Sequence, residues 1–207
     1  MANRLRVKMC GMTRAQDIAY AAALGVDAIG FIFYPKSPRY ISIEQAKQLI
    51  HQVPAFLNIV AVLVNPDVSL VQQIIKELPV HYLQFHGNES ARFCTGFKKP
   101  YIKAIQALSP DFIAKKCLEH TEASAILLDT PSVSHGGTGK MFDWNVIPDT
   151  LIKPLILAGG LTAENIEKAA KEHSFYAVDV CSGVEASPGI KDHEKMNQFV
   201  NALWGKG

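Results

Sequence analysis

Eight short apolar segments, spaced roughly 20 to 30 residues apart, are the feature that most limits how this chain can fold. Each is followed by a segment with the hydrophobic period of a helix, which is the pattern of repeated strand–helix units. Most of the segments are continuously apolar rather than alternating, as parallel strands are when helices cover them. We predict strands at residues 6–10, 28–33, 59–64, 81–85, 101–105, 125–129, 155–159 and 176–180.

Eight parallel strands favour closure of the sheet into a barrel. The chain has 207 residues, 48% of them hydrophobic, and no linker rich in Gly, Pro or Ser divides it. We therefore predict a single α/β domain, a (β/α)8 TIM barrel over residues 1–207. An open doubly wound sheet is the alternative, but the G-x-G-x-x-G motif typical of such a sheet does not follow the first predicted strand.

Helix boundaries are expected where capping residues stand between the strands. Thr13 with Gln16 and Ser42 with Gln45 have the spacing of capping boxes, and Ser109 precedes a proline at a first helical position. Gly25 and Gly96 are expected at helix ends, where a left-handed residue is commonly needed.

Composition excludes several classes of function. The formal net charge is +2 and there is no dense basic run, so we expect no binding to nucleic acid or to an anionic membrane. The longest apolar runs have the length of strands, and the N-terminal segment lacks an apolar signal core, so no membrane span and no cleaved leader are expected. Four widely spaced cysteines without a C-x-x-C pair argue against a zinc ribbon or a disulfide framework and favour the cytoplasm.

Two of the connections that follow predicted strands have the composition of a phosphate site. Gly159 and Gly160 precede Thr162, a candidate helix cap, and Ser182 and Gly183 begin a predicted extra helical turn. Amides at helix starts lack partners and carry the positive end of the helix dipole, and glycine lets a phosphate approach them closely. Loops after the seventh and eighth strands are the usual phosphate site of barrels, whereas the glycine pair alone could mark a tight turn.

Cys10 ends the first predicted strand and Asp129 ends the sixth. A barrel would bring this thiol and this carboxyl to one mouth from opposite sides. A base and an acid of different intrinsic acidity suit an isomerisation by proton transfer. A cysteine at a strand end is more often a small buried apolar residue, and the presence of Asp129 is what favours a catalytic pair.

Four further polar residues are candidates for contacts with a substrate. Arg39 could hold a carboxylate through two parallel hydrogen bonds, or could be a solvated surface residue. Asp179 lies inside the eighth predicted strand, where a charge is costly unless it is paired or bonded to ligand hydroxyls. Gln84 and His86 end the fourth strand without the spacing of metal ligands, so we assign no metal.

Six segments, in order along the chain, resemble the phosphoribosylanthranilate isomerase family of tryptophan biosynthesis. They are VKMCGMTR, GFIFYPKSPRYIS, LQFHGNE, LLDT with GGTGKMFDW, LAGGLTAENI and VDVCSGVEASPGIKD, and they run from Val7 to Asp192. The resemblance implies a (β/α)8 barrel that converts N-(5-phosphoribosyl)anthranilate to 1-(2-carboxyphenylamino)-1-deoxyribulose 5-phosphate by an Amadori rearrangement. It implies no cofactor and a small phosphorylated molecule as partner, with monomer and homodimer both open.

The resemblance also implies roles for the candidate residues. Cys10 corresponds to the general base that takes the proton from ribose C2′, and Asp129 to the general acid that protonates the ring oxygen. Arg39 corresponds to the residue that meets the anthranilate carboxylate. Gln84, His86 and Asp179 correspond to polar residues of the pocket, and Gly159, Gly160, Ser182 and Gly183 fall in the phosphate loops.

One position departs from the family pattern. Cys181 stands where the pattern has serine, which weakens any side-chain contact with phosphate and leaves the backbone amide unaffected. A second expectation concerns residues 132–140, whose glycine content is compatible with a mobile lid.

Three other functions were weighed. A histidine-pathway isomerase performs the same Amadori chemistry but resembles a two-aspartate catalyst, which Cys10 opposes. A metal-dependent sugar-phosphate epimerase would need His and Asp ligands at several strand ends, and only His86 has such a place. A non-catalytic phosphometabolite-binding module should have lost Cys10 or Asp129, and both are present.

Overall fold

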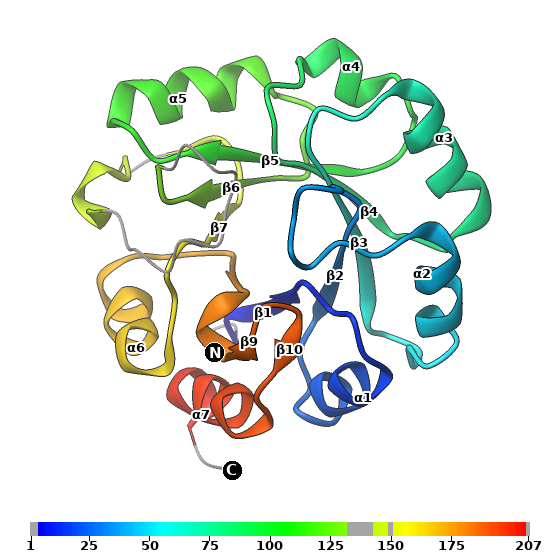
Figure 1. Ribbon diagram of the computed structural model, residues 1–207. Coiled ribbons are helices and arrows are strands. Elements are labelled where there is room, and N and C mark those ends of the chain that lie inside the picture. Colours follow the sequence, from blue (N-terminus) through cyan, green and yellow to red (C-terminus); the bar gives the residue numbers. More distant parts are fainter. Residues whose placement is uncertain (1–3, 132–142, 149–150, 206–207) are drawn as a thin grey trace.

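The computed structural model describes residues 4–131, 143–148 and 151–205. Eight parallel strands form a closed barrel in which each strand pairs with the next along the chain and the last pairs with the first (Figure 1). They are β1 (Arg6–Cys10), β2 (Ala28–Ile32), β3 (Asn58–Leu63), β4 (Tyr82–Phe85), β5 (Tyr101–Gln106), β6 (Ala125–Asp129), β7 (Leu155–Leu157) and β8 (Ala177–Val180). The predicted α/β class and (β/α)8 barrel are confirmed.

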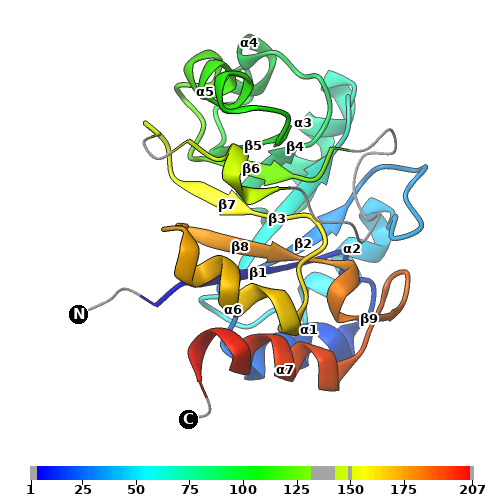
Figure 2. The same ribbon diagram turned by 90° about the vertical axis from the view of Figure 1, so that its left-hand side faces the viewer.

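Helices surround the barrel (Figures 1 and 2). They are α1 (Ala15–Ala23), α2 (Ile43–Ile50), α3 (Val68–Glu77), α4 (Ala91–Thr95), α5 (Pro110–Glu119), α6 (Ala163–Glu172) and α7 (His193–Trp204). Between β6 and β7, the residues that the structure describes contain one turn of 3-10 helix, η1 (Trp144–Val146). No helix in the described ranges is long and apolar enough to cross a membrane.

Alternation along each strand separates the core from the site. In β1, Val7 and Met9 belong to the apolar cluster between strands and helices, whereas Cys10 belongs to a second cluster inside the barrel. Lys8 shares the inner face with Cys10, since successive side chains of a strand point to opposite sides. In β6 the same rule places Asp129 on the inner face, at the carboxyl end of the strand. The barrel therefore delivers both candidate catalytic groups to one mouth.

Two of the expected helix starts are confirmed. Ser42 begins α2 with a full capping box: its Oγ accepts from Gln45 N at 3.2 Å, and Gln45 Oε1 accepts from Ser42 N at 2.8 Å. Ser109 accepts from the amide of Phe112 at the start of α5, with proline at the first helical position. The expected left-handed glycine after α1 is Gly25, with φ of 75°.

Two other expectations about helix ends are wrong. Arg14, not Thr13, is the N-cap of α1, because the Thr13 hydroxyl donates to the carbonyl of Gly189 instead. Gly96 does follow α4, but its φ of −60° is right-handed, so this helix end does not use the conformational freedom of glycine.

A small hairpin after β8 was not expected from the sequence. The turn η2 (Ser182–Val184) leads into the antiparallel strands β9 (Glu185–Ser187) and β10 (Ile190–Lys191). Gly189, with φ of 80°, makes the turn between them. This hairpin is the proline-containing segment between β8 and α7. Its residues bond to Thr13 and Arg14, which follow β1, so the segment packs beside β1 at the mouth of the barrel (Figure 2).

We predict that Ser42→Ala lowers the free energy of unfolding by about 1 kcal/mol, because the amide at N3 of α2 loses its acceptor. Urea denaturation followed by circular dichroism measures this change. Ser69→Ala is the matched control, since Ser69 is an exposed residue within α3 and its loss should leave stability within about 0.5 kcal/mol. Equal effects of the two substitutions would contradict the capping assignment.

Candidate active site

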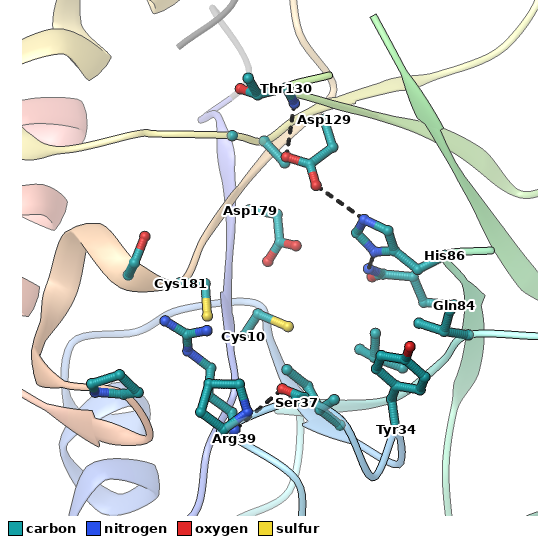
Figure 3. A pocket seen from close by; sticks show the side chains of 18 of the residues that line it. Cys10, Tyr34, Ser37, Arg39, Gln84, His86, Asp129, Thr130, Asp179 and Cys181 are labelled. Carbon is teal, nitrogen blue, oxygen red and sulfur yellow. Dashed lines mark hydrogen bonds and ion pairs between the residues drawn. The ribbon is translucent and has the colours of Figure 1, made fainter. Parts of the chain in front are cut away.

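One cavity of about 560 Å³ lies at the carboxyl ends of the barrel strands (Figure 3). This volume is in the range of sites for small molecules, about 300–1,000 Å³. All ten site residues expected from the sequence line it: Cys10, Arg39, Gln84, His86, Asp129, Gly159, Gly160, Asp179, Ser182 and Gly183. Residues from six different strand ends and their following loops therefore converge on one space.

Cys10 is buried at the end of β1, with 5% of its surface exposed. The neighbouring residue on β2 is Gly30, and a Cβ there would lie 2.8 Å from Cys10 Sγ and 3.2 Å from Lys8 Nζ. Glycine at this position thus leaves room for the thiol and an ammonium group together. A positive charge beside a thiol favours its ionised form.

Lys8 forms a buried ion pair with Asp179, with 2.8 Å between Nζ and Oδ1. The two residues are register partners in β1 and β8. Burial raises the pKa of Asp179 to about 7, because the Lys8 charge offsets only part of the cost of desolvation. Burial opposes the charge of Lys8 as well, but the Asp179 carboxylate more than compensates and raises the pKa of Lys8 above its ordinary range. Asp179 therefore has the internal partner that its burial demands.

The sequence analysis missed Lys8. Its signal was available, because a lysine two residues before Cys10 in a strand shares the face of Cys10. A lysine in an otherwise apolar strand is costly unless a carboxylate faces it, and Asp179 was the candidate.

The surroundings of Cys10 lower the pKa of its thiol. The contact with the Cys181 thiol has the largest effect, and the charges of Lys8 and Lys191 add to it, together outweighing the opposing effect of burial. The same contact, with burial, raises the pKa of Cys181. Within this pair, ionisation of Cys10 is therefore favoured over ionisation of Cys181.

Asp129 is held at both of its oxygens. Oδ1 accepts from the backbone N–H of Thr130 at 2.8 Å, and Oδ2 lies 3.0 Å from Nε2 of His86. Nδ1 of His86 lies 3.3 Å from Nε2 of Gln84 (Figure 3). A Cβ on Gly159 would lie 2.9 Å from Asp129 Oδ1, so the glycine lets the loop after β7 pass close over the acid. His86 thus fixes the orientation of Asp129.

Gln84 has one atom that the protein does not use. Its Oε1 is buried and has no hydrogen-bond partner among the described residues. A buried acceptor without a partner is costly, and Gln84 is one of the residues that line the cavity. It can accept a hydrogen bond from a hydroxyl of a bound molecule.

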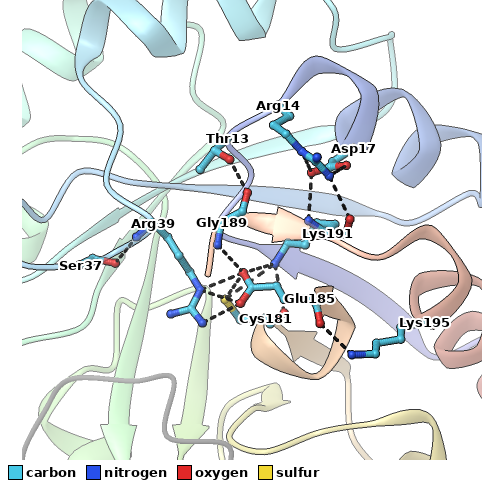
Figure 4. A network of polar contacts seen from close by, with 10 residues as sticks. All are labelled: Thr13, Arg14, Asp17, Ser37, Arg39, Cys181, Glu185, Gly189, Lys191 and Lys195. Carbon is cyan, nitrogen blue, oxygen red and sulfur yellow. Dashed lines mark hydrogen bonds and ion pairs between the residues drawn. The ribbon is translucent and has the colours of Figure 1, made fainter. Parts of the chain in front are cut away.

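Arg39 is buried rather than solvated, with 7% of its surface exposed. Its Nε and Nη2 bind the Glu185 carboxylate of β9 at 2.9 and 2.7 Å, and Lys191 Nζ lies 3.0 Å from the same group (Figure 4). The surface interpretation of Arg39 is therefore wrong, and the two parallel hydrogen bonds expected for a substrate go to Glu185. Nη1 makes no contact with Glu185 in this arrangement, and Arg39 still lines the cavity.

The loops after β7 and β8 lie against each other. A Cβ on Gly183 would lie only 1.8 Å from the carbonyl oxygen of Leu161, so residue 183 must be glycine for this approach. Gly160, with φ of 65°, precedes the N-cap of α6, where Asn165 Oδ1 accepts from the amide of Thr162. Gly159 and Gly160, before the N-cap of α6, and Ser182 and Gly183 of η2 therefore border one part of the cavity.

Cys181 does not have the surroundings expected of a phosphate ligand. Its sulfur lies 3.2 Å from the position of a Cβ on Gly11, and its polar contacts are with Lys191 Nζ and Glu185 Oε1, each at 3.9 Å. The expected lid at residues 132–140 lies outside the described residues. Within the described ranges, no group of three or more His, Cys, Asp or Glu side chains is gathered closely enough to hold a metal.

A family model for N-(5'phosphoribosyl)anthranilate (PRA) isomerase matches residues 7–202. The chain belongs to the phosphoribosylanthranilate isomerase family. The N-(5'-phosphoribosyl)anthranilate isomerase of Legionella pneumophila (strain Lens) is 59% identical over 204 residues, which cover 98% of this chain and 99% of that protein. Members of this family are enzymes of tryptophan biosynthesis, and this chain is a phosphoribosylanthranilate isomerase.

Solved structures of the phosphoribosylanthranilate isomerase family share the whole fold. The enzyme from Thermotoga maritima superposes with a TM-score of 0.89 at 36% identity, covering 98% of this chain and all of that chain. A second isomerase structure, in complex with reduced 1-(o-carboxyphenylamino)-1-deoxyribulose 5-phosphate, has a TM-score of 0.83 at 33% identity, covering 98% of this chain and 100% of that one.

We predict that Lys8→Met moves the pH dependence of Cys10 alkylation to higher pH. Only the thiolate reacts, and the substitution removes a cation that lowers the pKa of Cys10. The measurement is the rate of iodoacetamide labelling of the Cys10 peptide by mass spectrometry between pH 5 and 9. Lys47→Met, at a lysine on the exterior of α2, is the control and should leave the curve in place. A curve unchanged in Lys8→Met would remove Lys8 from the ionisation of Cys10.

Proposed function

We propose that this chain converts N-(5-phosphoribosyl)anthranilate to 1-(2-carboxyphenylamino)-1-deoxyribulose 5-phosphate by an Amadori rearrangement, with Cys10 as general base and Asp129 as general acid. The observation that carries this proposal is that the two residues, from β1 and β6, line one cavity. A thiol and a carboxyl in one water-poor site supply the two different proton affinities that the reaction needs.

The first proton transfer opens the sugar ring. Asp129 donates a proton to the ribose ring oxygen, and the bond from that oxygen to C1′ breaks as the anthranilate nitrogen forms an iminium with C1′. Since Asp129 Oδ1 accepts from the Thr130 amide, Oδ2 is the oxygen that carries the proton. His86 beside Oδ2 holds the acid in place.

The second transfer moves the double bond. The Cys10 thiolate removes the proton from C2′, which gives an enolamine, and its tautomerisation yields the ketone of the product. Lys8 and the Cys181 thiol favour the thiolate and so make Cys10 a base near neutral pH.

Recognition uses the two ends of the cavity. The phosphate binds at the amides of Gly159, Gly160, Ser182 and Gly183, at the starts of α6 and η2. The anthranilate carboxylate meets Arg39 through Nη1, the part of the guanidinium not engaged by Glu185. Gln84 Oε1 and Asp179 bind hydroxyls of the opened sugar. In support, a related isomerase structure holds a reduced ligand with the same three groups.

The reaction needs no cofactor and no metal, because every step is a proton transfer between substrate and side chains. We also infer that the enzyme works in the cytoplasm. Four free cysteines in the described residues suit a reducing compartment.

We predict that Cys10→Ala and Asp129→Asn each lower kcat by about 10²- to 10⁴-fold with little change in KM, since each removes one proton transfer. Turnover of freshly generated substrate, followed by its loss of fluorescence, measures both constants. Cys94→Ala, at a buried residue of α4, is the matched control and should keep the native rate. An active Cys10→Ala enzyme with an unchanged pH profile would falsify the assignment of the base.

We predict that Gly183→Ala weakens binding of inorganic phosphate by about tenfold or more, a loss of about 1.4 kcal/mol. The new methyl group would strike the Leu161 carbonyl and push apart the two loops that form the phosphate site. Competitive inhibition by phosphate measures the effect. Gly96→Ala, whose Cβ would meet only ordinary contacts, is the control. Native phosphate inhibition in Gly183→Ala would place the phosphate elsewhere.

A further inference from the structure

Cys10 and Cys181 are neighbours across the seam at which the barrel closes. The register of β1 and β8 pairs Met9 with Val180, and Cys10 and Cys181 are the residues that directly follow this pair, Cys181 at the point where β8 gives way to η2. Neighbouring strands lie about 4.7–4.9 Å apart. This separation falls inside the range of about 4.4–6.8 Å between Cα atoms that a disulfide spans.

The two side chains also point to the same side. Lys8 and Asp179 meet inside the barrel, and Cys10 lies two residues further along β1 on the same inner face. Cys181, the first residue after β8, packs against the inner apolar cluster that contains Cys10. Both line the catalytic cavity (Figure 3). A Cβ on Gly11 would lie 3.2 Å from Cys181 Sγ and 2.8 Å from Cδ of Arg39, so the absence of a side chain at Gly11 leaves room for the Cys181 thiol.

The surroundings divide the roles between the two sulfur atoms. Lys8 lies beside Cys10, and Lys191 Nζ lies 3.9 Å from Cys181 Sγ. The pKa of Cys10 is lowered by the Cys181 thiol and these cations, whereas the pKa of Cys181 is raised by its contact with Cys10. One thiolate that reacts first and one thiol next to it are the two parts of a redox-active cysteine pair.

We propose that Cys10 and Cys181 form an oxidisable pair that a hydroperoxide converts to an intramolecular disulfide, and that this disulfide reversibly inactivates the enzyme. The inactivation rests on the proposed role of Cys10 as the base, whereas formation of the disulfide does not. The serine that the family pattern has at position 181 could not form this bond.

The chemistry balances with the hydroperoxide as the oxidant. The Cys10 thiolate attacks one peroxide oxygen, the O–O bond breaks, and the leaving hydroxide or alkoxide takes up a proton. Cys10 is then a sulfenic acid. The Cys181 sulfur attacks the Cys10 sulfur, the S–O bond breaks, and the hydroxide leaves as water with the proton of Cys181. The two thiols lose two electrons, and the peroxide gains them.

The other two cysteines provide an internal contrast. Cys94 in α4 and Cys117 in α5 are buried outside the barrel, and desolvation raises the pKa of Cys94 to about 12 and raises that of Cys117 as well. A protonated, buried thiol reacts slowly with peroxide. Oxidation should therefore be confined to the pair in the cavity.

The test is to treat the native protein with hydrogen peroxide, quench it with catalase, and divide the sample. One part is alkylated, digested and analysed by mass spectrometry; the other is assayed before and after dithiothreitol. We expect a peptide pair joined through Cys10 and Cys181, lighter by two hydrogens than the separate peptides. Free thiols should fall from four to two, and activity should fall in proportion to the joined fraction and return with dithiothreitol.

Two variants make the test specific, with each activity expressed relative to the same variant before treatment. In Cys181→Ser, Cys10 has no resolving thiol, so peroxide should cause a loss that dithiothreitol does not restore, because Cys10 proceeds to sulfinic acid. Cys117→Ala should behave as the native protein, with the joined peptides and full recovery.

Absence of the joined peptides in the native protein would overturn the proposal, and so would equal recovery in Cys181→Ser. Joined peptides with full activity would overturn the proposed inactivation and would also contradict the role of Cys10 as the base. The kinetics of Cys10→Ala test that role separately, without any oxidant. The failure of one proposal is thus distinguishable from the failure of the other.

Discussion

The buried ion pair between Lys8 and Asp179 joins the first and last strands of the barrel. Removal of one partner of such a pair costs about 3–5 kcal/mol, because the other charge stays buried without compensation. The pair therefore favours a single register at the seam, in which Cys10 and Cys181 come next to each other. The position of the segment that follows β8 depends on that register. This segment contains the start of η2 and the hairpin whose Glu185 binds Arg39.

Local patterns were sufficient to predict the barrel and the positions of its functional groups. Strand period, strand length and the order of units fix the topology, because connections between parallel strands are short and of one hand. Once the strands close, a side chain that points inward at the carboxyl end of a strand faces the mouth of the barrel. Cys10, Asp129 and Gln84 were therefore placed correctly in the cavity by their positions in the sequence alone.

Pairings between distant residues could not be predicted in this way. Arg39 and Glu185 are 146 positions apart, so no local spacing relates them. The position of Arg39 at the cavity was foreseen, but its carboxylate partner within the chain was not. The prediction that Thr13 caps α1 was wrong for the same reason. Its hydroxyl donates to the carbonyl of Gly189, in a hairpin far along the chain.

Binding of an anionic substrate and ionisation of a thiol are both favoured by positive charge around this site. Lys8, Lys191 and Arg39 bring positive charge close to the cavity, each beside a carboxylate, and the two lysines also stabilise the Cys10 thiolate. The thiolate is the form that can act as a base and also the form that peroxide oxidises. A site that uses Cys10 as a base near neutral pH, as we propose, is therefore exposed to oxidation by its own electrostatics. The residue at position 181 then determines whether that oxidation stops at a reversible disulfide or proceeds to acids of sulfur that a thiol reductant cannot restore.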